Sequence, residues 1–582
     1  MESGPTAPPR AGITQQIVAN ALASAADEMA TTIFRTAHST VVRDCLDFSA
    51  ALATKKGEIV AQAVTVPLHL GSVPAGMATF LERYADALSP GDVFIMNDPF
   101  DGGMHLPDIF IFAPIFHEGE HIGFATTTAH HADVGGRRSG STACDNTDVF
   151  QEGLRLPWLR LYEKGKPVDD VFRIIQANVR IPRMALGDIK AQIAACRAGE
   201  KALQELAERY GREELAELME GLLDYTEGLV RGEISGWPDG TARFEDYLDS
   251  DGLEETEVRV VAEVTISGDM ITADFSESDP MVRGALNSTR SFTQAAVYHT
   301  VRCAMEGDIP YTGGAFRPIE VITKPGTVAH VVMPAASSAR GVTGFRMIDA
   351  LNGALAQLIP ERVAAAGEGG NTLAIFGTDW EGQHHIFFEL PVGTWGATAV
   401  ADGNDGVSNL ASAAANIPVE VAEAEFPIMI ECYGFVPDTG GPGEYRGGLS
   451  IERAWRCRSL EASLTIRSDR RHHPPYGLNG GKPGTRSINL RRGEDGSEEV
   501  LPSMVSTTLM KGEVFYHRLP GGGGHGDSLL RDPEAVAADV LNEKISPAHA
   551  RAEYGVAFAA DGLVDEQETR ALRVRLRDGQ AP

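Results

Sequence analysis

A group of histidine and aspartate residues lies within residues 96–136, where the sequence pattern predicts a β-hairpin. Two apolar runs, residues 109–116 and 122–128, flank a polar turn around Gly119, as expected of two antiparallel strands joined by a glycine-containing loop. Folding the segment about Gly119 places Asp108 opposite His130, and directly opposed residues have Cβ atoms about 4.5–5.5 Å apart. That separation suits two ligands of one metal ion.

Three more residues flank this pair. His105 lies three residues before Asp108, in a glycine- and proline-rich approach that can fold over the same point, and His131 and Asp133 follow His130. Mixed imidazole and carboxylate ligands without thiolate favour Mn²⁺, Fe²⁺ or Zn²⁺ and leave positions for water or substrate. The alternative is that each is a satisfied turn residue, because His and Asp near strand ends commonly have that role.

Composition limits the classes of function. The chain has 582 residues, of which 43% are hydrophobic and 23% charged, so we expect two or three domains with ample cores. The net charge of −30 argues against a polyanion partner, because phosphate binding depends on Lys and Arg. We therefore expect neither a nucleic acid nor an anionic membrane as partner.

Cysteine usage and the N-terminal segment indicate the compartment. The six cysteines contain no CxxC pair, so neither a thiolate zinc site nor a redox motif is predicted. The N-terminus lacks the basic and apolar regions of a signal peptide, and no stretch approaches the length of a transmembrane helix. A cytoplasmic enzyme fits best. The cysteines are Cys45, Cys144, Cys196, Cys303, Cys432 and Cys457.

The elements that must position the hairpin form an N-terminal α+β domain, residues 1–185. Apolar residues at spacings of four predict a helix over residues 13–36. Residues 40–42, 48–54 and 58–66 are rich in β-branched and apolar residues and are predicted as strands.

A second domain, residues 186–420, begins with a predicted helical pair over residues 188–231, broken at Gly211. Strands over residues 241–280 and two helices, residues 291–305 and 345–358, complete a central α+β domain.

The third domain, residues 421–582, is glycine- and proline-rich and mainly β. Residues 461–467 are predicted as a strand and residues 533–541 as a helix, and Leu572, Val574 and Leu576 alternate with arginines, which is the periodicity of a strand. The fold class expected for the whole chain is therefore multidomain α+β, a mixed α/β chain with antiparallel sheets and a helical pair in the middle.

Common catalytic loops are missing from the sequence. It has no GxxxxGK[ST] loop and no GxGxxG after a strand, and Gly521–Gly524 is not followed by Lys-Ser or Lys-Thr. ATP chemistry would therefore need another chain. A G-x-S-x-G elbow is also absent, which disfavours a covalent hydrolase.

Motifs along nearly the whole chain resemble those of the hydantoinase B/oxoprolinase family. This family includes N-methylhydantoinase B-type subunits, caprolactamase β subunits, the C-terminal half of 5-oxoprolinases, and subunits of acetone and acetophenone carboxylases. The motifs are D-F-S at 47–49, N-D-P at 97–99, G-G-x-H-L-P-D at 102–108, H-H-A-D-V-G-G at 130–136, Q-E-G at 151–153, N-V-R at 178–180, A-D-F-S at 273–276, G-E-Y-R-G-G at 443–448, P-P-Y-G-L at 474–478, L-P-G-G-G-G at 519–524 and E-Y-G-V at 553–556.

The resemblance implies a divalent metal, Mn, Zn or Fe, held by Asp47, His105, Asp108 and His130. Asp47 is added by the resemblance alone, because periodicity cannot bring it from a distant strand. His131 and Asp133 then become candidates for catalytic roles, facing substrate or supporting a ligand, and a carboxylate such as Asp133 could orient a ligand imidazole.

The resemblance also implies a division of labour between two chains in a hetero-oligomer. A larger hydantoinase A-type subunit would use ATP-Mg to phosphorylate a small cyclic amide, and the chain described here would hydrolyse the activated amide with a metal-bound water whose pKa is lowered toward about 7. The alternatives are a subunit of an ATP-dependent acetone- or acetophenone-type carboxylase and a non-catalytic scaffold subunit. The motifs do not select the substrate.

Overall fold

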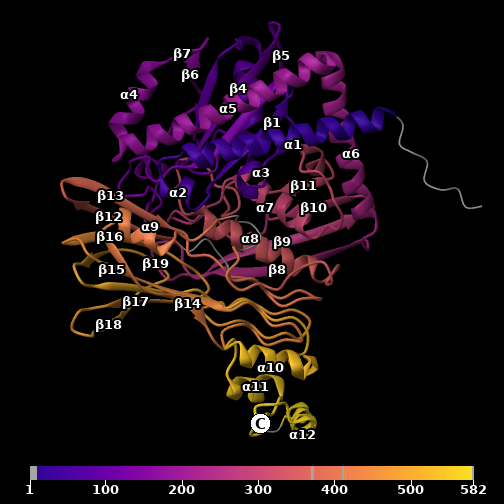
Figure 1. Cartoon of the computed structure of the whole chain (residues 1–582), viewed down its shortest axis with the longest axis vertical. Helices are drawn as coiled ribbons and strands as arrows, with labels where there is room; N and C mark the ends of the chain where they lie inside the picture. The colour runs from indigo at the N-terminus through magenta and orange to yellow at the C-terminus, as the bar shows by residue number, and fades with distance from the viewer. Residues whose placement is uncertain (1–9, 369–372, 409–411, 413, 580–582) are drawn as a thin grey trace, which may run out of the picture.

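The computed structural model describes residues 10–368, 373–408, 412 and 414–579. Within these residues four separate sheets alternate with helices, and most strand pairs are antiparallel, so the expected α+β class is confirmed. Figure 1 shows an elongated molecule with the N-terminal sheet at the top, β-rich layers below it and a small group of helices at the bottom. None of the described helices is both long and apolar enough to cross a bilayer.

The first sheet has seven strands in the order β2-β1-β5-β4-β3-β6-β7, all paired antiparallel. The predicted hairpin is confirmed at its centre, and Asp108 is the register partner of His130. The bounds are β1 (Phe48–Thr54), β2 (Ile59–Gln62), β3 (Val93–Met96), β4 (Asp108–His117), β5 (Glu120–His130), β6 (Leu159–Glu163) and β7 (Lys166–Pro167).

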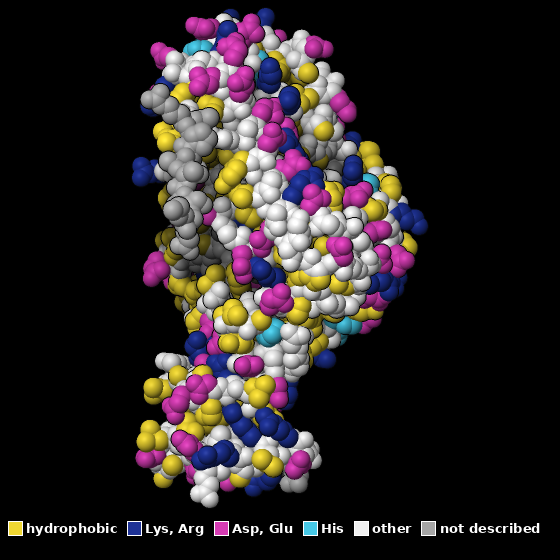
Figure 2. Space-filling view, turned by 90° about the vertical axis from the view of Figure 1, so that its right-hand side faces the viewer, with side chains coloured by type: hydrophobic (Ala, Val, Ile, Leu, Met, Phe, Trp, Pro, Cys, Tyr) yellow, Lys and Arg dark blue, Asp and Glu magenta, His cyan; other side chains and the backbone are white. Residues whose placement is uncertain are grey.

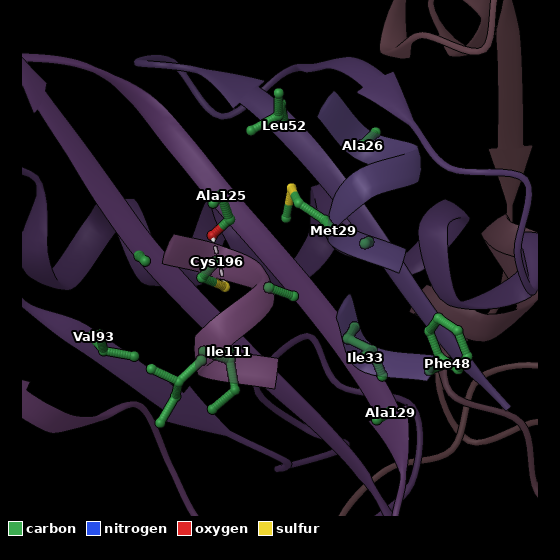
Figure 3. Close-up of a cluster of buried hydrophobic side chains, with 14 of the residues drawn as sticks. Ala26, Met29, Ile33, Phe48, Leu52, Val93, Ile111, Ala125, Ala129 and Cys196 are labelled. Atoms are coloured by element: carbon green, nitrogen blue, oxygen red, sulfur yellow. Dashed lines mark hydrogen bonds between the residues drawn. The ribbon is translucent and has the colours of Figure 1, made fainter. Parts of the chain in front are cut away.

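Helices cover both faces of this sheet because its strands are buried on both sides. On one face lie α1 (Arg10–Thr36) and α5 (Pro182–Tyr210), which pack on β1, β4 and β5. Figure 3 shows Met29 and Ile33 of α1 above this face, and the Cys196 thiol of α5 lies 3.7 Å from the Ala125 carbonyl oxygen. Successive strand residues point to opposite faces, so Ile111 belongs to this layer and Phe110 to the other.

On the opposite face lies α3 (Pro67–Tyr84), whose Phe80 ring packs 4.8 Å from that of Phe94 and 5.6 Å from that of Phe112. Behind α3 come α7 (Arg290–Cys303) and α8 (Arg340–Leu355). Phe292 and Phe345 from these helices join the same apolar cluster. These helices therefore pack between the seven-stranded sheet and a second sheet.

The second sheet has the order β11-β10-β9-β8, with β10 and β11 parallel, and α8 packs on β8 and β9. The strands are β8 (Gly240–Leu248), β9 (Val258–Ser267), β10 (Met270–Asp274) and β11 (Ile319–Ile322). The predicted helical pair is confirmed by α5 and α6 (Arg212–Ser235), and the two predicted central helices by α7 and α8.

The remaining two sheets share one apolar cluster, in which the Trp455 and Phe515 rings stack 5.3 Å apart and Phe376 approaches from the facing sheet. Their orders are β13-β12-β16-β19 and β14-β15-β20-β17-β18. The strands are β12 (Leu373–Trp380), β13 (Gln383–Glu389), β14 (Ile428–Val436), β15 (Ser450–Cys457), β16 (Glu461–Arg467), β17 (Ile488–Arg492), β18 (Glu498–Val500), β19 (Met504–Met510) and β20 (Val514–Arg518).

Three helices, α10 (Pro533–Leu541), α11 (Pro547–Tyr554) and α12 (Glu566–Arg577), form a lobe around Val536 and Tyr554 at the lower end of the molecule. Figure 2 shows this lobe joined to the main body through a narrower waist.

Two predicted strands are wrong. Residues 40–42 lie in the short helix α2 (Thr40–Arg43), because the Ser39 hydroxyl accepts a hydrogen bond from the Val42 amide and caps it. Residues 572–576 lie in α12, where Asp565 caps the N-terminus and the chain runs from glutamates in the first turn to arginines in the last. Capping and charge placement therefore override the short alternation.

The expected domain boundaries fall within elements of the structure. The boundary near residue 185 lies inside α5. The boundary near residue 420 lies inside α9 (Val419–Glu425), between the strands β13 and β16 of one sheet.

Candidate metal centre

The open end of the β4–β5 hairpin brings three of the predicted ligands together. Asp108 is the first residue of β4 and His130 the last of β5. The Asp108 Oδ1 atom lies 3.0 Å from His130 Nδ1 and 3.1 Å from His105 Nε2. All three side chains are buried, and they form a cluster able to hold a metal ion.

Asp47 reaches the same point from β1, the neighbouring strand. Its carbonyl oxygen accepts a 3.0 Å hydrogen bond from the His130 amide, and its Oδ2 atom lies 4.0 Å from His130 Nδ1. The preceding Leu46 has a φ of +61°, which makes the sharp bend that delivers Asp47 to the sheet edge. The structure therefore places Asp47 beside the group that His105, Asp108 and His130 form.

His69 is a fifth member that the sequence analysis missed. It lies in the first turn of α3, with Nε2 3.3 Å from Asp47 Oδ1 and 3.8 Å from Asp108 Oδ1. A helix start could have been found from Pro67, because proline favours the first helical position. No spacing rule, however, connects a helix residue to a hairpin it meets only in three dimensions.

The distances between donor atoms fit a shared ion. Ligands about 2.1 Å from one ion are about 3.0 Å apart at right angles and about 3.4 Å apart in a tetrahedron, and Asp108 Oδ1 lies 3.0 Å from His130 Nδ1 and 3.1 Å from His105 Nε2 in the three-residue group. Asp47 and His69 lie beside this group, with donor atoms 3.3 to 4.0 Å from their nearest partners. His105 Nδ1 lies 2.9 Å from the Ser338 carbonyl oxygen. That bond requires a proton on Nδ1 and leaves Nε2 free to coordinate, as outer partners of ligand histidines commonly arrange.

The electrostatics favour the forms that bind cations. Burial lowers the pKa of His105 to about 3, and the charge of Arg340 acts in the same direction. Burial also lowers the pKa of His69. Although burial opposes ionisation of Asp108, the charges of His105 and Arg340 hold the pKa of that carboxyl well below its usual range. Neutral imidazoles and an ionised carboxylate are the protonation states that metal ligands require.

Two buried arginines border the cluster. Arg340, at the start of α8, forms an ion pair with Asp108 Oδ2 and lies over the Phe292 ring at 3.9 Å. Arg467, at the end of β16, donates a 3.1 Å hydrogen bond to the Ser338 carbonyl oxygen. Both line a cavity of about 30 Å³ together with Asp47, His69, His105 and His130. Ser412 lines this cavity and also a larger one of about 740 Å³.

His131 and Asp133 are placed elsewhere. His131 follows the last residue of β5, and its Nε2 atom lies 3.1 Å from the Gln192 side-chain oxygen of α5, on the face opposite α3. Asp133 accepts a 2.7 Å hydrogen bond from Arg180. Neither lines the cavity beside the cluster. The two-residue period of a strand predicts this for His131, because adjacent residues face opposite sides.

The sequence model of the hydantoinase B/oxoprolinase family matches residues 11–528. The chain belongs to this family. It is 31% identical over 579 residues to a Pseudomonas protein provisionally assigned as the B-type subunit of a D-/L-hydantoinase, covering 96% of this chain and 98% of the relative. It is 30% identical to the β subunit of the caprolactamase of Pseudomonas jessenii, with 96% and 98% covered.

Two solved structures have the same fold as this chain. The crystal structure of ATP-dependent caprolactamase from Pseudomonas jessenii matches with a TM-score of 0.90 at 29% identity, covering 97% of this chain and 99% of the other. A nucleotide-free acetone carboxylase also matches with a TM-score of 0.90, at 21% identity and with 98% and 83% covered. The latter likeness is one of fold.

Proposed function

We propose that this chain is the metal-bearing component of an ATP-dependent cyclic amidohydrolase that acts on a hydantoin or lactam together with a larger, hydantoinase A-type subunit that uses ATP-Mg. The observation that carries the proposal is the convergence of His69, His105, His130 and the carboxylates of Asp47 and Asp108 beside one small cavity. The similarity to a B-type hydantoinase subunit and to the β subunit of caprolactamase supports the substrate class and a hetero-oligomer.

The proposed ligands of a divalent Mn, Zn or Fe ion are Asp47, His105, Asp108 and His130, with His69 as a fifth donor. Such an ion would lower the pKa of a coordinated water and stabilise negative charge on a carbonyl oxygen. The Ser338 carbonyl holds the His105 ring in its coordinating tautomer, and Arg340 fixes one oxygen of Asp108 while the other faces the histidines.

We propose that His131 and Asp133 do not contact the substrate but hold the end of the β4–β5 hairpin in place. His131 contacts Gln192, whose side-chain amide donates to the Ile109 carbonyl next to Asp108. Asp133 accepts from the Arg180 guanidinium and from the Gly140 amide, and so orders the segment after His130. These contacts indicate that both residues support the end of the hairpin.

The first test is elemental analysis of the purified chain and of its His105→Ala and His130→Ala variants. We expect one tightly bound divalent metal in the unchanged chain and loss of that metal in both variants. The matched control is His117→Ala at the far end of the same hairpin, which should retain the metal. A metal-free chain, or variants that keep both metal and activity, would leave the scaffold alternative standing.

The second test separates the reactions. The purified complex would be supplied with ATP and candidate hydantoins or lactams, and in parallel with ketones and bicarbonate. Ring opening coupled to ATP use is expected, whereas ketone-dependent carboxylation without ring opening would replace the proposal by the carboxylase alternative. The chain without its partner should show no turnover with ATP and lactam, because its sequence offers no phosphate-binding loop.

A further inference from the structure

Arg467 is buried without an ion-pair partner beside the metal cluster. Its side chain is 1% exposed, and its one hydrogen bond among the described residues goes to the Ser338 carbonyl oxygen. Its Nε atom has no partner there, a feature that it shares with other buried arginines such as Arg453, so the missing ion pair is what distinguishes Arg467. Buried arginines are ordinarily paired, because an unpaired buried charge costs several kcal/mol or more. Because Arg467 lines a cavity, we infer that an anionic ligand in the cavity pairs with its guanidinium.

A second buried arginine shows what the usual arrangement looks like in this chain. Arg453 is equally buried at 1% exposure, but its guanidinium lies 3.0 Å from the Glu389 carboxylate and also donates to the Ile417 carbonyl. Arg467 has no such carboxylate, and burial together with the charge of Arg340 lowers its pKa to about 10. It therefore stays charged at neutral pH. The charges of Asp47 and Asp108 act on it from a distance, and no carboxylate of the described residues forms a close ion pair with it.

The charges around the cavity define the missing ligand. Asp47 and Asp108 contribute two negative charges, Arg340 and Arg467 two positive charges, and imidazoles that bind metal are neutral. These side chains sum to zero, so a divalent cation leaves about two uncompensated positive charges on the site. A doubly charged oxyanion balances that excess, whereas a single carboxylate balances half of it.

The size of the cavity sets how much of the ligand enters. A volume of about 30 Å³ holds only one or two groups the size of water. Ser412 also lines the larger cavity of about 740 Å³, whose other lining residues include Trp395, Tyr311 and Tyr433. Only part of an anionic head fits beside Arg467, so the rest of that group and the organic remainder would lie in the larger space.

We propose that Arg467 binds the phosphoryl group of the activated substrate, holding it against the metal with its planar fork of N–H donors, while the 740 Å³ cavity receives the organic part. Guanidinium geometry matches phosphate oxygens in pairs. This assignment rests on the proposed function, since it takes the phosphorylated amide as the substrate, but it makes a separate prediction about the ligand-free protein.

The test compares Arg467→Met with Arg453→Met in the full-length, metal-loaded chain. Melting temperature and calorimetric binding would be measured with inorganic phosphate as the probe. The unchanged chain should bind phosphate and melt at higher temperature as phosphate is added. Arg467→Met should weaken phosphate binding at least about 10-fold without lowering the melting temperature of the phosphate-free protein, because it removes a charge that has no partner.

Arg453→Met should behave in the opposite way. It leaves Glu389 buried and unpaired, so its melting temperature should fall while the remaining folded protein keeps its phosphate affinity. If Arg467→Met does not fold, Arg467→Lys supplies the second variant, which keeps the charge, loses the fork and should still bind phosphate several-fold more weakly.

Three outcomes would overturn the assignment: phosphate binding unchanged in the Arg467 variants, no phosphate binding by a chain that contains metal, or acetate binding as tightly as phosphate, which would indicate a carboxylate site. Elemental analysis of the same samples separates this failure from that of the proposed function. A metal-free chain whose phosphate binding still depends on Arg467 would refute the metal centre and keep the anion site.

Discussion

Glu152 is a buried carboxyl group that contacts the proposed metal centre only through the backbone of Ser337 and Ser338. Its ionisation should lower the free energy of unfolding of the protein as pH rises. Its Oε1 atom accepts hydrogen bonds of 2.7 Å from the amides of both Ser337 and Ser338. The Ser338 carbonyl in turn holds His105 and Arg467. Glu152 thus fixes the segment that orients a proposed ligand.

The size of the effect follows from the pKa. Burial raises the pKa of Glu152 from 4.5 to about 8, although the two amide hydrogen bonds oppose the shift. The native state therefore keeps a proton that the unfolded chain releases, so this contribution is complete below pH 4.5 and is lost as pH rises through about 8. At about 1.4 kcal/mol per unit the whole change is about 5 kcal/mol, of which about 3 kcal/mol falls between about pH 5.5 and about pH 8.

The perturbation that isolates this effect is Glu152→Gln. Glutamine keeps an oxygen for the two amides, while its NH₂ replaces Oε2, which has no partner among the described residues. The unsatisfied NH₂ costs about 1–3 kcal/mol at every pH. The free energy of unfolding of the variant should therefore start below that of the unchanged protein at about pH 5.5 and gain about 3 kcal/mol relative to it by about pH 8.

The assay is equilibrium urea unfolding of both proteins across this pH range, followed by tryptophan fluorescence. Glu208→Gln on an exposed surface of α5 is the control and should follow the pH dependence of the unchanged protein. Parallel curves for Glu152→Gln and the unchanged protein would refute the reasoning. Glu152→Ala, which removes the oxygen that accepts from both the Ser337 and Ser338 amides, should in addition lower metal affinity about 10- to 100-fold, as loss of an outer partner does.

Three other predictions concern the cluster and the packing around it. His69→Ala should weaken metal binding at least about 10-fold in competition with a chelator, and an unchanged affinity would remove His69 from the proposed ligands. Phe80→Ala should lower the free energy of unfolding by about 3–5 kcal/mol in urea, because the fully buried ring packs 4.8 Å from Phe94 and 5.1 Å from Trp158; a loss below about 1 kcal/mol would contradict that packing. Gly447→Ala should destabilise the protein by about 3 kcal/mol, because the new Cβ would lie 1.9 Å from the Gly522 carbonyl oxygen, whereas Gly434→Ala, with nothing within 4 Å, should change the melting temperature much less.

The sequence determined those features that depend on local periodicity. The two apolar runs on either side of the turn at Gly119 predicted the hairpin and the pairing of Asp108 with His130, and spacings of three and four predicted α1, α5 and α6. It failed where helix capping overrides a local strand pattern. Ser39 caps a helix that begins with a β-branched run, and Asp565 caps a helix whose residues 572–577 alternate like a strand. The two-residue period of a strand, applied to His131, would have placed it on the opposite face from His130.

Only the tertiary structure decided how distant segments meet at the hairpin end. Asp47 arrives through the pairing of β1 with β5, and His69 through the packing of α3 on the sheet face that carries Asp108. Arg467 comes from a strand more than three hundred residues later. No local pattern encodes such meetings, because they result from which apolar faces bury one another. The residues that line the cavity are therefore far apart in the sequence, and their charges act on one another only because the fold brings them into one buried space.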